Sequence, residues 1–247
     1  MNSKVVRAAD VQKHFDELSE HYDEVKEKNR YYYESLKSVV AGIIPEGKRI
    51  LDIGTGTGEI LNVLRPSRGI GIDLSPKMIE KAKGKFRHLD FFAADYESFE
   101  TDERFDYILM TDLIEHVERP DRLFLRIQRF CSADTRVVLT MANPLWEPLL
   151  HLLEVMHLKM DEGPHHRISE NQVFHHARSQ GFELSFSDCF LLLPLRIFFL
   201  SRLVNHGIGR IPVIKRLALI KLYVFDRKPD GRERGLKRRS VSPQHGY

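Results

Sequence analysis

Residues 49–59 read Arg-Ile-Leu-Asp-Ile-Gly-Thr-Gly-Thr-Gly-Glu, an apolar run followed by three glycines at alternate positions. The run is short, continuous and rich in isoleucine, which is typical of a strand buried on both faces of a parallel sheet. Gly54, Gly56 and Gly58 then predict a tight turn into a helix that begins near Glu59. Because backbone N–H groups in such a turn can approach a ligand closely, the turn predicts a binding site at the end of this strand.

The spacing of the glycines distinguishes between the ligands that such turns bind. A dinucleotide fingerprint reads Gly-x-Gly-x-x-Gly, and here Glu59 stands where its third glycine would be. The loop therefore lacks the usual cradle for a pyrophosphate, and Asp52 at the strand end favours a nearby cationic group. A sulfonium with an amino-acid tail fits this pattern better than two phosphates. The alternative is a strand–helix turn that binds no ligand.

Residues 49–59 resemble motif I of the class I S-adenosylmethionine (SAM)-dependent methyltransferases, and the chain from Phe15 to Asp226 keeps the motif order of that family. Its pattern is similar to ubiquinone-pathway enzymes and to bacterial methyltransferases encoded beside glycosyltransferases. The resemblance implies a Rossmann-like α/β fold with a seven-stranded, mostly parallel sheet and helices on both faces. It also implies SAM as cofactor, S-adenosylhomocysteine as product and methyl transfer as the reaction.

The residues predicted to bind the cofactor lie at the ends of successive strands. Asp73 ends a strand predicted for residues 68–74, roughly twenty residues after the glycine loop, where an acid typically meets ribose hydroxyls. Ser75 and Pro76 then predict the cap and first residue of a helix. By the resemblance, Asp95 and the following Tyr96 bind the adenine amine. The full predicted set is Asp52, Gly54, Thr55, Gly56, Gly58, Asp73, Leu74, Asp95, Tyr96 and Thr111.

A polar cluster follows the strand predicted for residues 105–112. Asp112, Glu115 and His116 are spaced i, i+3 and i+4, so a helical turn would place them on one side. His116 is the candidate catalytic base, which would take a proton from an acceptor hydroxyl or amine. The cluster also resembles the Glu-x-x-Glu-His turn that is associated with a divalent cation in ubiquinone-pathway O-methyltransferases, although its first acid is Asp here. We predict a turn without a metal and keep these three residues as the alternative ligands.

We expect one methyltransferase domain over residues 1–226, because the chain can bury one sizeable α/β core. Residues 11–45 carry apolar side chains at helical spacing and resemble the cap that closes over the cofactor in small-molecule methyltransferases. Tyr22 or one of the tyrosines at 31–33 is expected to contact ligand, and simple packing of the helices on the sheet is the alternative. Further elements are predicted as a helix over 121–131 and strands over 135–143, 182–192 and 219–226.

An insertion at residues 144–168 follows the fifth strand, where this family builds its acceptor pocket. Trp146, His165 and His166 are its candidate lid residues, and an apolar lid with a few polar groups suits a small-molecule or lipid-like acceptor. The two cysteines, Cys131 and Cys189, lie in apolar segments and are predicted to be buried thiols, which indicates a reducing compartment.

The positive charge is concentrated near the C-terminus. Of 38 Lys and Arg residues, 13 lie at or beyond Arg196, whereas only three of the 35 acids do. A second insertion at residues 194–217 is apolar and basic and contains no acid, which suits a membrane surface or a lipid-linked anionic substrate. Packing on the enzyme's own core or on a second subunit is the alternative, and nucleic acid is disfavoured because bulky aliphatic residues interrupt the basic ones. Residues 227–247 are expected to be disordered.

The sequence thus predicts a SAM-dependent methyltransferase that acts on a small-molecule, glycan or lipid-linked acceptor. The pattern specifies the cofactor and reaction but not the acceptor or the oligomeric state. A catalytically silent SAM-fold protein that binds a partner through its basic C-terminal surface is the alternative. Residues 1–10 do not have the pattern of a signal peptide, so we expect a cytoplasmic location, with peripheral contact at the inner membrane surface through residues 194–217.

Overall fold

The fold is taken from a computed structural model, which describes residues 7–146, 168–191 and 217–228. The predicted lid residues His165 and His166 lie outside the described residues, as do all but the last residue of the basic insertion and nearly all of the C-terminal tail. In the described ranges, no helix is both long enough and apolar enough to cross a membrane.

A seven-stranded sheet forms the centre of the molecule, with the strand order β3-β2-β1-β4-β5-β7-β6. The neighbours from β3 to β5 pair in parallel, and β7 runs antiparallel to both β5 and β6. This confirms the predicted seven-stranded, mostly parallel sheet. The strands are β1 (Arg49–Ile53), β2 (Arg68–Asp73), β3 (Asp90–Ala93), β4 (Phe105–Thr111), β5 (Cys131–Ala142), β6 (Phe182–Phe190) and β7 (Ile220–Arg227).

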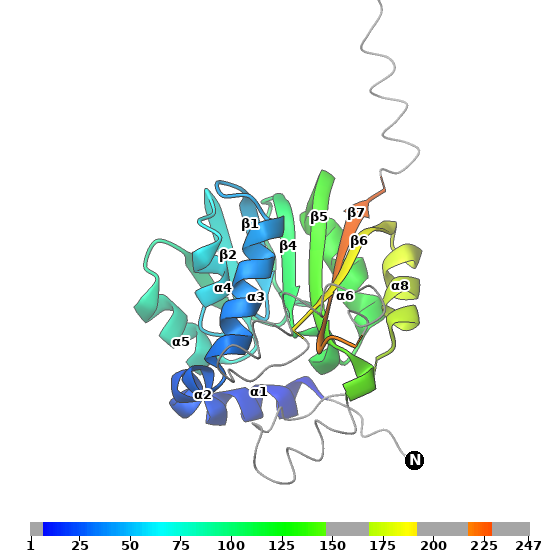
Figure 1. The fold of residues 1–247 in the computed structure, drawn as a ribbon. Coiled ribbons are helices and arrows are strands. Elements are labelled where there is room, and N and C mark those ends of the chain that lie inside the picture. The colour runs from blue at the N-terminus through cyan, green and yellow to red at the C-terminus, as the bar shows by residue number, and fades with distance from the viewer. Residues whose placement is uncertain (1–6, 147–167, 192–216, 229–247) are drawn as a thin grey trace, which may run out of the picture.

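Helices cover both faces of the sheet and one of its edges. Figure 1 shows α1 and α2 across the lower edge of the sheet, where the parallel strands end, and α3 in front of the central strands. The α-helices are α1 (Ala8–Leu18), α2 (Tyr22–Lys28), α3 (Arg30–Ile43), α4 (Glu59–Val63), α5 (Pro76–Lys85), α6 (Pro120–Ile127) and α8 (Glu170–Ser179). Short 3₁₀ turns are η1 (Ser19–His21), η2 (Ile114–His116), η3 (Gln128–Phe130) and η4 (Pro144–Trp146).

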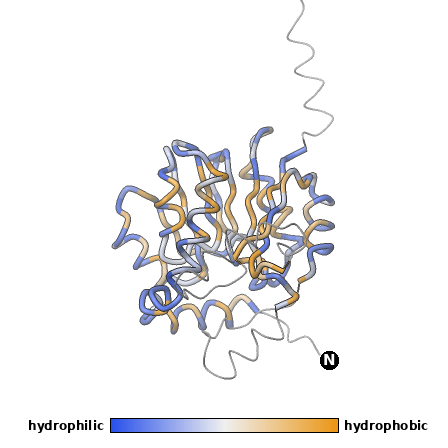
Figure 2. Tube along the Cα trace, in the orientation of Figure 1, coloured by the Kyte–Doolittle hydropathy of each residue, from blue (hydrophilic) through white to orange (hydrophobic). Residues whose placement is uncertain are grey.

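The alternation of side chains along the strands divides the core into two layers. Ile50 belongs to the cluster that packs on α3, α4 and α5, whereas Leu51 and Ile53 belong to the cluster on the opposite face with α6 and α8. All three side chains are buried, as expected for a central strand covered on both sides. Figure 2 shows that the central strands consist mostly of hydrophobic residues.

Three local predictions need correction. The helix expected over 121–131 ends at Ile127, and Cys131 already begins β5, four residues before the predicted start of the strand. The reason is a register shift against β4, stabilised by Thr135, whose hydroxyl donates to the Phe105 carbonyl at 2.6 Å. Cys131 is buried as predicted, but Cys189 is only half-buried. Asp112 lies outside the helical turn at η2 and has a left-handed backbone (φ 51°).

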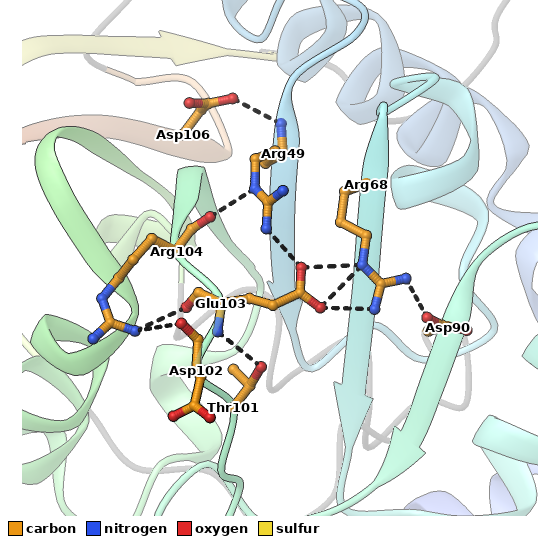
Figure 3. A network of polar contacts seen from close by, with 8 residues as sticks. All are labelled: Arg49, Arg68, Asp90, Thr101, Asp102, Glu103, Arg104 and Asp106. Carbon is orange, nitrogen blue, oxygen red and sulfur yellow. Dashed lines mark hydrogen bonds and ion pairs between the residues drawn. The ribbon is translucent and has the colours of Figure 1, made fainter.

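An ion-pair network holds together the strand starts at the edge of the sheet opposite the cap (Figure 3). Glu103, in the loop before β4, accepts from the guanidinium of Arg49 at 2.6 Å and from that of Arg68 at 2.8 Å. Arg68 also pairs with Asp90, and the backbone N–H of Arg49 donates to Asp106 at 2.8 Å. One carboxylate therefore links the first residues of β1 and β2, and its two partners reach β3 and β4.

We expect Glu103→Gln to lower the free energy of unfolding by about 1 kcal/mol, because it breaks two ion pairs of a partly buried network. Glu100→Gln is the matched control, since Glu100 also pairs with two arginines, Arg126 and Arg129, but is well exposed. Hydrogen bonds from Arg68 lower the pKa of Glu103. The extra stability of the wild-type protein over Glu103→Gln should therefore be complete above about pH 4.5 and should decrease as the pH falls below that value. Urea unfolding at pH 7 and pH 3.5 measures both effects, and equal losses in the two variants would contradict the network.

Candidate functional site

The glycine loop between β1 and α4 is shaped by close packing at its two ends. Gly54 and Gly58 both have left-handed backbones, with φ of 76° and 78°. A Cβ at Gly54 would lie 2.8 Å from Cδ1 of Leu113, and a Cβ at Gly58 would lie 2.6 Å from Cζ of Phe91. Both distances are shorter than real Cβ contacts, so a side chain at either position would strain the backbone and displace a neighbouring side chain.

Gly56, in the middle of the loop, also has a left-handed backbone, with a φ of 55°, and is less tightly packed than its neighbours. A Cβ at Gly56 would have no neighbour closer than the hydroxyl oxygen of Tyr22, at 3.6 Å. The N–H of Gly56 donates to Oδ2 of Asp73 at 2.8 Å, and the N–H of Ser75 donates to Oδ1 of the same carboxylate at 2.9 Å. The end of β2 is thus fastened to the loop that follows β1, beneath a tyrosine of the cap.

Asp52, the last polar side chain of β1, is a buried carboxylate with incomplete hydrogen bonding. It is 1% exposed, and its Oδ2 accepts from the Thr55 hydroxyl at 2.7 Å. Its Oδ1 has no hydrogen-bond partner among the described residues. Burial raises the pKa of Asp52 to about 7, an effect that the Thr55 hydrogen bond opposes and the nearby Asp73 reinforces. A cation that approached this carboxylate would stabilise its charged form.

The cap formed by α1, α2 and α3 makes three polar contacts with the loops that follow three different strands. Ser75, after β2, donates its hydroxyl to Asp16 of α1 at 2.5 Å. Lys26 of α2 donates to the hydroxyl of Thr57 in the glycine loop at 3.1 Å. The third contact, at 2.5 Å, is from the hydroxyl of Tyr32 in α3 to Oδ2 of Asp112, just after β4. The cap is therefore bound directly to the site end of β1, β2 and β4.

The predicted polar cluster after β4 is distributed over separate partners. Asp112 accepts hydroxyl bonds from Tyr32 and, at 2.9 Å, from Thr140 of β5. Glu115 accepts from the backbone N–H of Ala142 at 2.7 Å. The ring of His116 makes an edge contact with Phe15 of α1, with centroids 5.4 Å apart. Within the described ranges, no group of three His, Cys, Asp or Glu side chains is arranged to hold a metal ion, and this includes the alternative ligand set Asp112, Glu115 and His116.

The remaining predicted site residues lie along the same edge of the sheet. Asp95 follows β3, and its Oδ1 accepts from the N–H of Glu97 at 2.8 Å. The Tyr96 hydroxyl donates to the carbonyl of Arg119 at 3.3 Å, across to the loop after β4. Leu74 directly follows Asp73, and Thr111 ends β4 beside the central strand. All ten predicted cofactor residues thus lie at or beyond the ends of β1 to β4.

An apolar cluster flanks this edge on the side of β5 and β7. Leu191, Leu219 and Ile220 form its buried core, and the aromatic rings around it are those of Tyr31, Tyr32, Trp146 and Phe190. The indole N–H of Trp146 donates to the carbonyl of Leu217 at 2.6 Å. This bond links the segment that follows β5 to the segment that precedes β7. The predicted lid residue Trp146 therefore lies beside cap residues of α3.

Sequence reasoning missed Lys26, Asp16 and Thr140 as members of the site. Lys26 belongs to no motif in the sequence, yet its side chain is only 13% exposed. The only sequence signal was its position four residues after Tyr22, which places the two side chains on the same helix face.

Comparison with known proteins agrees with this geometry. A family model described as a methyltransferase domain matches residues 25–185. A ubiquinone biosynthesis O-methyltransferase of Coxiella burnetii is 33% identical over 95 residues, which are 36% of this chain and 41% of that protein. An uncharacterized protein of Methanocaldococcus jannaschii is 27% identical over 125 residues, which are 51% of this chain and 59% of that protein. The matches thus span well under two thirds of these curated relatives.

Solved structures share the fold over most of the chain. The structure of a SAM-dependent methyltransferase from Thermotoga maritima superposes with a TM-score of 0.67, at 20% sequence identity, and covers 88% of this chain and 100% of its own. At this identity the likeness is one of fold.

We expect Asp52→Asn to change the pH dependence of stability. Between the ordinary pKa of 3.8 and about 7, the folded protein keeps a proton on Asp52 that the unfolded chain has lost, so wild-type stability falls as the pH rises through this window. Asn cannot ionise and can still accept from Thr55. The free energy of unfolding of the variant, relative to that of wild type, should therefore rise from pH 4 to pH 8. Urea unfolding at several pH values measures the difference, with exposed Asp102→Asn as control. A constant difference would contradict the raised pKa.

Proposed function

The chain belongs to the family of SAM-dependent methyltransferases, and we propose that it transfers the methyl group of SAM to a small-molecule, glycan or lipid-linked acceptor. The observation that carries the proposal is the pair of acids at the ends of β1 and β2, on either side of a glycine loop. Asp52 and Asp73 place negative charge where a cationic nucleoside would lie, and the loop between them offers backbone N–H groups.

The residues present fit SAM in three respects. No atom comes closer than 3.6 Å to the position of a Cβ at Gly56, so no side chain packs tightly against the loop where the cofactor would approach its backbone. The pKa of the Tyr22 hydroxyl is raised by burial first, and the nearby Tyr33, Asp73 and Asp112 reinforce the shift, so this hydroxyl stays protonated and can donate a hydrogen bond to a ligand. Asp52 has a buried oxygen without a partner among the described residues, which suits the amine of an amino-acid tail.

We assign the holding of the cofactor to residues along the ends of β1 to β4. Asp73 would bind the ribose hydroxyls, for which its oxygens have further lone pairs besides those that accept from Gly56 and Ser75. Asp95 and Tyr96 would bind the adenine, and Leu74 and Thr111 would line the site. When bound, SAM supplies an electrophilic methyl group. The protein's contribution would be mainly to align the acceptor with that group and to exclude water.

The acceptor side of the site combines aromatic and acidic residues. Tyr31, Tyr32 and Trp146 surround a buried apolar cluster, and Asp112 lies at the boundary between that cluster and the glycine loop. An apolar wall with a few fixed polar groups suits an acceptor with an apolar body and a reactive hydroxyl or amine. The relative that acts in ubiquinone biosynthesis in Coxiella burnetii supports this class of acceptor.

His116 is the proposed base for the acceptor proton. It lies in η2, directly beyond the end of β4, and the ring of Phe15 from the cap contacts it edge-on. An acceptor hydroxyl loses its proton as its oxygen forms the new bond to carbon, and the imidazole of His116 would take that proton.

The binding prediction concerns Asp73→Asn. We expect SAM to bind the wild-type protein, and the variant to bind about 10- to 100-fold more weakly, because a charged hydrogen-bond acceptor is lost. Isothermal titration calorimetry measures both affinities. Asp90→Asn is the matched control, because Asp90 pairs with Arg68 at the opposite end of the sheet and should leave SAM binding unchanged. Absence of SAM binding by the wild-type protein would refute the proposed function.

The catalytic prediction concerns His116→Asn. We expect kcat to fall by about 100-fold while the Kd for SAM changes little, because a base acts on the acceptor and not on the cofactor. The assay follows transfer of a labelled methyl group from SAM to small-molecule, glycan and lipid fractions of a bacterial extract. His88→Asn, on the loop before β3, is the control. Labelled product with an undiminished kcat would remove His116 from the reaction, and SAM binding with no product in any fraction would favour the catalytically silent alternative.

A further inference from the structure

Lys26 is a cation enclosed between the cap and the glycine loop. Its Nζ lies 4.6 Å from the centre of the Tyr22 ring and 5.2 Å from that of Tyr33, within the range of cation–π attraction. The same atom donates to the hydroxyl of Thr57, which is fully buried in the loop. The side chain of Lys26 thus ends between the glycine loop and the ring of Tyr22.

The ion pairs around Lys26 leave its charge incompletely balanced. Three lysines approach Glu59 at the start of α4, Lys37 at 3.0 Å, Lys85 at 3.5 Å and Lys26 at 3.7 Å. Lys37 also pairs with Glu34 at 3.1 Å, and Lys85 pairs with Asp23 at 2.6 Å. Among the described residues, Lys26 has no ion-pair partner other than the Glu59 that it shares, although it is the least exposed of the three.

The pKa of Lys26 agrees with an incompletely balanced charge. Burial, together with the neighbouring Lys85 and Lys37, lowers the pKa of Lys26 to about 8, while Glu59 and Asp23 oppose the shift only in part. A lysine in this condition gains stability from an additional anion. Asp52 suits the amine of the amino-acid tail and Asp73 suits the ribose hydroxyls, so the part of the cofactor that suits Lys26 is its one carboxylate.

We propose that Lys26 binds the carboxylate of the amino-acid tail of SAM. Through this contact the cap helps to select the cofactor as well as to cover the site. The inference rests on the proposed function, since it assumes that SAM occupies the space beside the glycine loop. It assigns to Lys26 a role in choosing between nucleosides that carry the carboxylate and those that lack it.

The test compares two ligands that differ in this group alone, SAM and decarboxylated SAM, which keeps the sulfonium and the amine. Calorimetry gives the Kd of each ligand for the wild-type protein and for Lys26→Met. We expect the variant to bind SAM about 10- to 100-fold more weakly, the range for a charge-assisted contact, and to bind decarboxylated SAM within about threefold of wild type. Lys37→Met is the matched control, because Lys37 approaches the same Glu59 but has Glu34 as a second partner.

The outcomes separate the inference from its premise. If Lys26→Met weakens both ligands by the same factor, Lys26 only holds the cap on the loop, and the proposal is overturned. It is overturned as well if neither affinity changes. Lys26→Arg should keep most of the preference for SAM, and Lys26→Gln replaces the Met variant if that one fails to fold. If the wild-type protein binds neither ligand, the proposed function itself fails.

Discussion

Buried charge without a full set of partners is the constraint on which the site end of this sheet depends. Asp52 and Lys26 are both largely removed from water, and each has fewer opposite charges or donors around it than a buried ion normally has. The opposite end of the sheet follows the usual rule, since Glu103 satisfies two arginines that in turn reach Asp90 and the backbone. The molecule therefore compensates its charges where they only stabilise the fold, and leaves them uncompensated where a ligand with both signs of charge is proposed to bind.

The glycine loop separates structural from functional needs residue by residue. The left-handed backbones of Gly54 and Gly58, together with the approach of Leu113 and Phe91, would make these two positions resist substitution even in a protein that bound no ligand. Gly56 has no such neighbour, and its N–H is used by Asp73. Because the left-handed backbone of Gly56 also favours glycine without a ligand, the motif is informative about function mainly through the acid that the N–H of Gly56 contacts.

Local signals explain why so much of the fold was predictable from the sequence. The buried run of β1, the Ser75 cap followed by Pro76, and Asp73 at the end of β2 each depend on neighbouring residues in the chain, and all three were correctly placed. The contacts of the cap were not predictable in the same way. Lys26 and Thr57 are 31 residues apart, and Tyr32 and Asp112 are 80 apart, so they meet only after the helices have packed on the sheet. A helical pattern reveals which face is apolar, but not which polar side chain at its border is enclosed.

The turn after β4 connects the cap to the glycine loop. Asp112 adopts a left-handed backbone, which costs on the order of 1 kcal/mol for a residue with a side chain. Its carboxylate accepts from the hydroxyls of Tyr32 and Thr140, and its N–H donates to the hydroxyl and carbonyl oxygens of Thr140. The turn places the next residue, Leu113, against Gly54, so the position of the cap, the bend after β4 and the closeness of the glycine loop depend on one another. Because α3 supplies the first of these bonds, the cap acts as part of the wall of the site, and a change at Tyr32 would reach the glycine loop through the turn after β4.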